Sequence, residues 1–250
     1  MKKLLITTMT LATIALLFCL SCSKDNDLDL VNQKVALSVK AQIMAGSSVM
    51  TKSIIDGELF AKGTNIGVEV VNNSSGGVYQ TGARTNIKYT KGGGHHHGSN
   101  HNKGRCSSWS ASTPFYLTSA VGNIYGYYPY NSNVGTNDEV FRTIPITINS
   151  AITTGDETDY MYATPGTCNN DNATEILEMN HALAQVSFYV YKENYSGTGE
   201  FTAFKIEDTD NTTSFIKTSR TELTMDITNG LIAGGQVGSL TRILGSTVTL

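Results

Sequence analysis

The residues best suited to chemistry are four histidines in one glycine-rich stretch, residues 92–104: His95, His96, His97 and His101. Imidazole nitrogens at this density can bind zinc, nickel or copper. Glycines make such a loop costly to order, and the sequence identifies no second set of residues that would orient the rings. The composition therefore favours an exposed polar loop. The four histidines are only weak metal candidates, and no cofactor is predicted.

Three other polar groups could do chemistry. Asp156–Asp159 and Asp208–Asn211 offer the oxygen ligands that Ca²⁺ prefers, but neither has the spacing of a twelve-residue calcium loop. We interpret both as Asx-rich turns. His181, as a catalytic base, would need an oriented nucleophile and a carboxylate, which the sequence does not identify. We expect it to be structural.

Enzyme classes with short motifs are not indicated. The sequence holds no phosphate-binding glycine loop, zinc-protease motif, nucleophile elbow or dinucleotide fingerprint. We therefore predict that the protein is not an enzyme. The formal net charge is −3, and there is no basic stripe, so nucleic acid is not an expected partner.

The N-terminus has the pattern of a lipoprotein signal. Lys2 and Lys3 precede an apolar stretch of residues 4–20, and Ser21 precedes Cys22. The stretch is too short and wrongly flanked for a stable membrane span. We predict a signal peptide over residues 1–21, lipidation of Cys22 by acyl chains such as palmitate, and a polar tether over residues 22–33. Two or more chains give lasting anchorage, where one would not.

Two further cysteines, Cys106 and Cys168, remain in the mature chain. An exported protein meets an oxidising compartment, in which they can pair. Their spacing does not determine their distance, so a disulfide and two separate thiols both remain open.

The elements that must position these residues are predicted to be strands. Thr, Tyr, Gly and Asn are abundant, which suits pleated surfaces joined by turns. Strand patterns and turn clusters alternate without helical periodicity between them, apart from at most a short helical turn in Glu178–Gln185. The pattern predicts an all-β sandwich. The strand candidates are 35–44, 66–71, 78–80, 86–90, 114–118, 123–130, 140–148, 160–163, 185–192, 200–207, 222–227 and 240–250.

The stretch Tyr125–Tyr130 could stack on sugar rings, because aromatic faces and hydroxyls suit glycans. Alternate residues of a strand face opposite sides, however, so packing is the favoured interpretation. We expect Trp109, just after the histidine-rich loop, to anchor the return of that loop to the sheet.

Five motifs resemble one family when they are taken in order. They are Thr51-Lys52, Gly63–Val68, Tyr125–Tyr130, Asp159–Ala163 and His181–Phe188. Together with the leader, they resemble fimbrillin-like proteins, the type V pilus subunits of Gram-negative anaerobes. The resemblance implies transthyretin-like, antiparallel β-sandwich domains. It implies a first domain over residues 34–232 and the start of an incomplete second domain over residues 233–250.

The resemblance also implies a surface lipoprotein of the outer membrane or fimbrium that acts as a pilus subunit or anchor in cell adhesion. Proteolysis after Lys52 would release the strand Val35–Met44, and a strand from another fimbrial subunit would replace it. Its partners would be those subunits and the lipid bilayer, while the receptor stays unidentified. The alternative is a surface lipoprotein that binds glycans or other ligands without polymerising.

Overall fold

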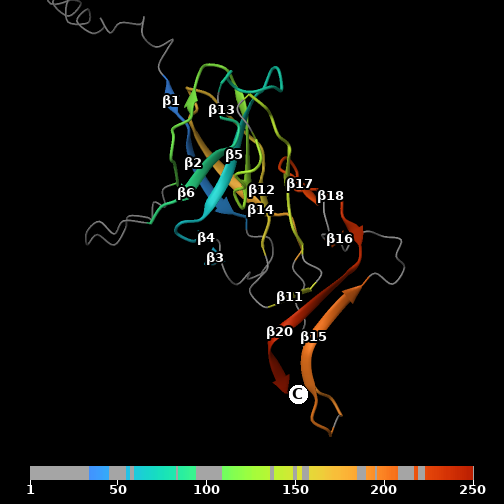
Figure 1. The fold of residues 1–250 in the computed structure, drawn as a ribbon. Helices are drawn as coiled ribbons and strands as arrows, with labels where there is room; N and C mark the ends of the chain where they lie inside the picture. The colour runs from blue at the N-terminus through green and yellow to red at the C-terminus, as the bar shows by residue number, and fades with distance from the viewer. Residues whose placement is uncertain are drawn as a thin grey trace, which may run out of the picture. The chain divides into compact units, whose positions relative to one another are not determined.

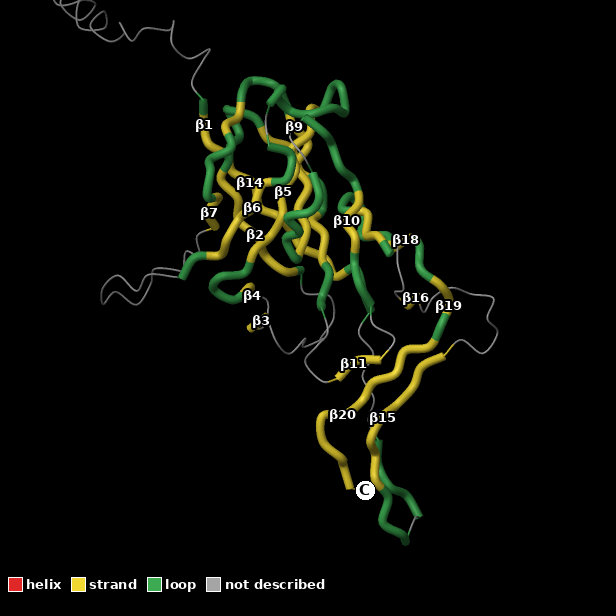
Figure 2. The backbone as a smooth tube through the Cα atoms, in the orientation of Figure 1, coloured by secondary structure: helices red, strands yellow, loops and turns green. Residues whose placement is uncertain are grey.

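The computed structural model describes residues 34–44, 55–56, 59–82, 84–93, 109–135, 138–148, 151–153, 158–184, 190–194, 196–207, 217–218 and 223–249. Every regular element in these ranges is a β-strand (Figure 1), and Figure 2 shows them joined by loops and turns. The predicted all-β class is confirmed. In this described part of the chain, no helix is long and apolar enough to cross a membrane.

The largest sheet has eight strands, in the order β2–β14–β12–β9–β5–β6–β7, with β13 paired to β9. Its pairs are antiparallel except β2–β14, which is parallel. Although β2 and β7 stand at opposite ends of this order, they contact each other, so the sheet curls strongly. The strands are β2 (Ser38–Ile43), β14 (Thr174–His181), β12 (Met161–Ala163), β9 (Gly122–Tyr128), β5 (Asn65–Asn72), β6 (Ile87–Lys91), β7 (Trp109–Ala111) and β13 (Gly166–Cys168).

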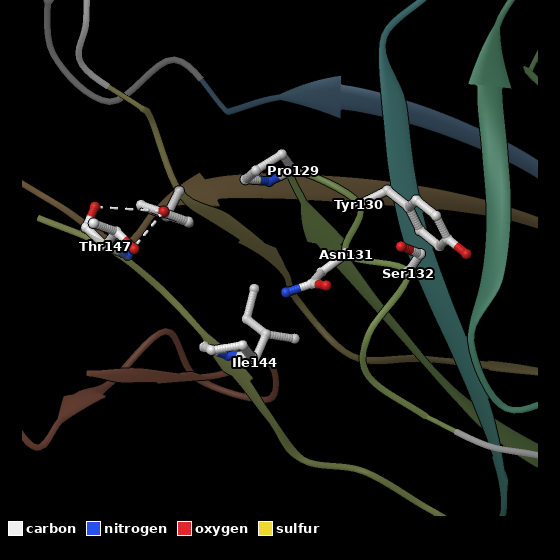
Figure 3. A pocket seen from close by; sticks show the side chains of 8 residues that line it. Pro129, Tyr130, Asn131, Ser132, Ile144 and Thr147 are labelled. Atoms are coloured by element: carbon white, nitrogen blue, oxygen red, sulfur yellow. Dashed lines mark hydrogen bonds between the residues drawn. The ribbon is translucent and has the colours of Figure 1, made fainter. Parts of the chain in front are cut away.

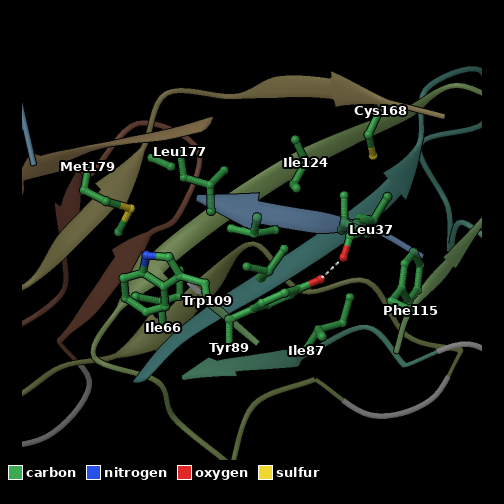
Figure 4. Close-up of a cluster of buried hydrophobic side chains, with 14 of the residues drawn as sticks. Leu37, Ile66, Ile87, Tyr89, Trp109, Phe115, Ile124, Cys168, Leu177 and Met179 are labelled. Atoms are coloured by element: carbon green, nitrogen blue, oxygen red, sulfur yellow. Dashed lines mark hydrogen bonds between the residues drawn. The ribbon is translucent and has the colours of Figure 1, made fainter. Parts of the chain in front are cut away.

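One face of this sheet encloses what we call the inner core. Strand side chains alternate between faces, and those on this face pack into a single cluster (Figure 4). It is the larger of the two clusters. Its buried members are Leu37, Val39, Ile43, Phe60, Ile66, Val68, Val70, Tyr79, Ile87, Tyr89, Trp109, Phe115, Leu117, Ile124, Tyr128, Met161, Ala163, Cys168, Leu177 and Met179.

The other face of the sheet carries what we call the outer core. It is covered by a small antiparallel sheet of β10 (Thr143–Pro145), β17 (Thr224–Asp226) and β18 (Ile232–Ala233). The alternation on β9 separates the two cores, because Tyr128 belongs to the inner core and its neighbour Tyr127 to the outer. The outer core comprises Tyr127, Ile144, Ile146, Tyr160, Leu223, Met225 and Ile227.

A third sheet, which we call the β15–β20 sheet, contains β15 (Glu200–Glu207), β20 (Ser239–Thr249) and β11 (Ala151–Thr153). Strand β20 pairs antiparallel with β15 and parallel with β11. None of the residues of β15 is buried, and the stacked rings of Phe201 and Phe204 are only partly covered. Where the structure describes the side chains of this sheet, in β15 and in residues 239–244 of β20, none of them is buried.

The remaining strands in the described ranges are short. Three two-stranded antiparallel pairs lie outside the larger sheets. They are β1 (Val35–Ala36) with β8 (Tyr116–Leu117), β3 (Ile55–Asp56) with β4 (Leu59–Phe60), and β16 (Lys217–Thr218) with β19 (Gln236–Val237).

Most strand predictions are confirmed, among them 35–44, 66–71, 123–130, 200–207 and 240–250, which correspond to β1–β2, β5, β9, β15 and β20. The prediction for 185–192 is not supported where it can be compared, because Val190–Lys192 is irregular and residues 185–189 lie outside the description.

The predicted helical turn in Glu178–Gln185 is wrong, because Glu178–His181 belong to β14. Leu177 and Met179 are fully buried, while Ile176 and Glu178, which alternate with them, are not. This period-2 alternation, with partners on both sides in β2 and β12, outweighs the helix-favouring side chains.

The predicted domain boundary between residues 232 and 233 stays a prediction. Strand β20, which lies in the proposed second domain, pairs with β15 and β11, which lie in the proposed first.

Candidate functional site

The strongest candidate site is the segment Val35–Ile43, which we call the leading strand. It consists of β1, Leu37 and β2, and β2 ends the strand order of the eight-stranded sheet. Hydrogen bonds join β2 to β14 over six register pairs, from Ser38↔Thr174 to Ile43↔Met179. An end strand is the one that another chain can replace without breaking the rest of a sheet.

The leading strand changes its partner at Leu37. Before this residue, Val35 and Ala36 pair antiparallel with Leu117 and Tyr116 of β8. At the change, Leu37 N donates to Phe115 O at 2.8 Å, and Ser38 N donates to Ala173 O at 2.8 Å. At the far end, Met44 N donates to Met179 O at 2.9 Å. The leading strand is therefore attached through β8 and the β14 region.

Alternate side chains of the leading strand fill the inner core. Leu37, Val39 and Ile43 are 5%, 2% and 7% exposed, and Ala41 packs against the same cluster. Lys40 and its outward neighbours are exposed. Burying three such side chains is worth roughly 5–9 kcal/mol. Withdrawal of the strand would therefore open apolar surface that a partner strand can cover.

The floor beneath the leading strand is aromatic and aliphatic. Figure 4 shows Leu37 facing Tyr89 from β6, with Phe115 at one side of the view and Trp109 toward the other. The Tyr89 hydroxyl donates to Leu37 O at 2.9 Å. Burial raises the pKa of Tyr89, so this hydroxyl stays a donor at any physiological pH. Trp109 packs edge-on against Phe60, with ring centres 5.4 Å apart.

On the opposite face of the sheet lies a partly buried ion pair that the sequence analysis missed. Glu69 of β5 is 0% exposed, and its Oε2 lies 2.7 Å from Nη1 of Arg142. Its Oε1 accepts the Phe141 N–H at 2.8 Å. The Arg142 guanidinium lies over the Tyr125 ring, 4.7 Å from its centre. An acidic residue within the apolar run 66–71 was the available signal.

Burial is the largest influence on the pKa of the Glu69 carboxyl. It raises the pKa of Glu69 to about 7, although the Phe141 N–H and Arg142 act in the opposite direction. The group fastens the segment before β10 to the large sheet. It has no link to the leading strand, because Glu69 and Tyr125 belong to the face that carries the outer core.

A pocket of about 360 Å³ opens beside the outer core (Figure 3). The lining side chains carry no formal charge, and they combine hydroxyls and an amide with proline and isoleucine. Tyr160 Oη, which belongs to the wall, accepts the Thr147 N–H at 2.9 Å. The lining residues are Pro129, Tyr130, Asn131, Ser132, Ile144, Pro145, Thr147 and Tyr160.

The tyrosine-rich strand does not form a glycan-stacking platform. Tyr127 and Tyr128 are 0% and 5% exposed and face opposite cores, as the packing interpretation predicts. Tyr127 donates to Asn86 Oδ1 at 2.9 Å. Of the four tyrosines in this stretch, only Tyr130 lines the pocket, next to Pro129.

His181 takes a structural position. Its Nδ1 lies 3.0 Å and 2.9 Å from the two carboxylate oxygens of Asp159. The pair ties the end of β14 to the segment before β12. The carboxylate partner that sequence reasoning could not name is therefore Asp159.

Trp109 begins β7 opposite Lys91, the last residue of β6, and is 8% exposed. The Lys91 ammonium lies 5.4 Å from its ring centre. Trp109 thus anchors the chain where it returns from residues 94–108, which lie outside the description.

Several predicted site residues also lie outside the described residues: Cys22, Lys52, His95, His96, His97, His101 and Cys106, together with Asp156, Glu157 and Asp208–Asn211. Cys168 is described and is 2% exposed, and burial raises its pKa to about 12. The Cys106–Cys168 disulfide stays a prediction. Across the described ranges, no group of three His, Cys, Asp or Glu residues could hold a metal ion.

The fold and the leading strand together define a class: an all-β protein in which part of the leading strand, β2, forms one end of the main sheet. A scan against family models matches the fimbrillin-like family over residues 51–243, and the chain belongs to this family. The predicted resemblance is confirmed. The matched region begins after the leading strand, so it includes β14 and β8 but not β2.

Among solved structures, the chain is similar to a candidate cell adhesion protein from Bacteroides ovatus. The two share 13% sequence identity over 88% of this chain and 78% of that one, with a TM-score of 0.47. None of the curated proteins matches this chain. The fimbrillin-like family is one of structural and adhesion proteins, and membership supports a fimbrial or adhesive role at the cell surface.

Proposed function

We propose that the protein is a surface lipoprotein that serves as a fimbrial subunit or anchor and assembles by proteolysis-triggered strand exchange. The predicted acylated Cys22 would hold it in the outer membrane. A cut near Lys52 would separate the leading strand from the remainder of the chain. A strand from another subunit would then take its place.

The observation that supports this proposal best is the construction of the leading strand. It supplies Leu37, Val39 and Ile43 to the inner core, yet its main hydrogen-bonded partner, β14, also pairs with β12 and so stays within the large sheet. Its other partner, β8, pairs with β1 alone and lies outside that sheet. It can therefore leave without any interior strand losing its place. The vacated position would expose apolar surface and unpaired backbone groups, both of which favour an incoming strand.

Limited trypsin treatment of the mature chain tests the proposal. We expect a first cut between residues 44 and 55, followed by complexes of increasing size in native mass spectrometry. Lys52→Gln should remove both the cut and the complexes, while Lys40→Gln should keep them, because Lys40 lies within the paired strand β2. A cut chain that remains monomeric with residues 34–44 still bound would contradict strand exchange.

The pocket beside the outer core supports a second candidate function, ligand binding without polymerisation. Its uncharged lining of hydroxyls, an amide and Tyr130 suits a neutral sugar. A glycan array on the intact chain tests this function. Binding that is lost in Asn131→Ala and kept in Lys192→Ala would favour it, whereas no binding above background would remove it.

A further inference from the structure

Where the leading strand changes its pairing partner, at Leu37, one backbone carbonyl is hydrogen-bonded by a side chain and not by a neighbouring strand. The N–H of Leu37 is directed to β8, while the N–H of the next residue is directed to Ala173 beside β14. The carbonyl of Leu37 is instead met by the side-chain hydroxyl of Tyr89, at 2.9 Å. A buried carbonyl without a partner is costly, so this contact completes the site.

Tyr89 is well placed to hold a fixed position. It is 2% exposed and stands on β6, which is hydrogen-bonded on both sides, to β5 and to β7. Its ring belongs to the inner core, and its hydroxyl reaches from β6 to the leading strand (Figure 4). Because β6 does not pair with the leading strand, Tyr89 would stay in place when that strand leaves.

A hydrogen bond to a main-chain carbonyl fixes where the bound strand lies along the site, and it does not depend on which side chain that strand carries. A hydroxyl donor can bond to the main-chain carbonyl of any residue, but only to a carbonyl at one point along the strand. A slip by one residue would turn every apolar side chain to the wrong face. The correct register therefore needs the Tyr89 contact and the apolar contacts at the same time.

We propose that Tyr89 is a register clamp: its hydroxyl fixes the position of whichever strand fills this site by donating to one main-chain carbonyl. The inference rests on the proposed strand exchange and describes the partner that it requires. That partner is an extended segment running parallel to β14, with apolar side chains where Leu37, Val39 and Ile43 lie.

The same contacts exclude proline at three places in the partner. Residues at the positions of Leu37, Ser38 and Met44 must each donate an N–H, to Phe115 O, Ala173 O and Met179 O respectively. Proline has no N–H to donate. The partner is thus defined by its backbone as well as by its apolar pattern.

Hydrogen exchange of the intact chain tests the clamp without strand exchange. Tyr89→Phe keeps the ring and removes the hydroxyl, and we expect amides of residues 37–43 to exchange roughly fivefold faster. Tyr160→Phe is the matched control, because it removes a hydrogen-bonded hydroxyl from the outer core. It should leave those amides unchanged. Equal exchange in Tyr89→Phe and the wild type, or equal acceleration by both variants, would overturn the clamp.

A peptide of residues 34–44 extends the test to the cut chain. Replacing the Leu37 carbonyl by a thioamide weakens the acceptor, and we expect roughly fivefold weaker binding to the wild-type chain. In Tyr89→Phe the thioamide should make no difference, which is the signature of a direct contact in a double-mutant cycle. Equal thioamide effects on both chains would overturn the clamp. If the cut chain takes up no peptide at all, strand exchange fails, and the hydrogen-exchange result still decides the role of Tyr89.

Discussion

The two cores of this protein differ in the segments that close them. The inner core includes three side chains from the leading strand, whereas the outer core is covered by β10, β17 and β18 and includes none of them. Loss of the leading strand should therefore damage one face of the large sheet and leave the other intact. A strand-exchanging subunit needs such a division, because it must stay folded while its site is empty.

The largest effect should come from truncating a buried side chain of β14, the strand that pairs with the leading strand. Leu177 is fully buried and stands directly opposite Ala41 in the pairing of β14 with β2. We expect Leu177→Ala to lower the free energy of unfolding by about 2–5 kcal/mol and to speed hydrogen exchange of the leading strand. Met225→Ala is the matched change in the outer core, where Met225 is 0% exposed. It should cost a similar free energy in urea unfolding without loosening the leading strand selectively, and identical exchange patterns in the two variants would remove the distinction between the cores.

The second effect is a dependence of the free energy of unfolding on pH, and it comes from Glu69 on the face that carries the outer core. The folded-state pKa of Glu69, raised by burial to about 7, exceeds the unfolded value of about 4.5. Between these values the folded state holds more protons, so the free energy of unfolding falls as pH rises through this window. The expected loss is about 3 kcal/mol. Urea unfolding at pH 4.5 and pH 8 should show that Glu69→Gln removes this slope.

The sign of that slope decides between two descriptions of the ion pair. If stability rose with pH in the wild type relative to Glu69→Gln, attraction to Arg142 would outweigh the cost of burial. The protection of the leading strand should not follow this titration, because Glu69 lies on the other face.

A smaller effect is expected within the leading strand itself. Val39 is 2% exposed, and Val39→Ala should cost about 2 kcal/mol in urea unfolding. The neighbouring Lys40 is exposed, so Lys40→Ala should change stability by less than about 0.5 kcal/mol. Equal effects at both positions would mean that the alternation of β2 does not determine its attachment.

The smallest effect is expected for one hydroxyl of the outer core. Tyr160→Phe removes the acceptor of the Thr147 N–H and should cost about 1 kcal/mol. Because Thr147 is exposed, water can replace the lost partner. A cost of several kcal/mol would show that this contact is essential to the outer core and not a local addition.

How much of this could be predicted from sequence depended on the range of the interactions. The run 66–71 and the alternation in 35–44 are local signals, and both correspond to strands. β14 was missed because Glu, Leu and Met also favour helices, and its strand character depends on pairing with β2, whose residues lie 136 positions earlier (174 − 38). The parallel direction of that pair had no local signal either. The Glu69–Arg142 pair was likewise hidden, because it joins residues far apart in the sequence.

The central claim is that the leading strand closes the inner core and can leave it while the outer core stays folded. Native-state hydrogen exchange at increasing urea, resolved for amides 38–44 and for β10 and β17, tests this claim most directly. We predict that the leading strand opens at a lower free energy than β10 and β17, which should exchange only on global unfolding. If all of these amides opened together with the global free energy at every urea concentration, the leading strand would be inseparable from the fold, and the account would be contradicted.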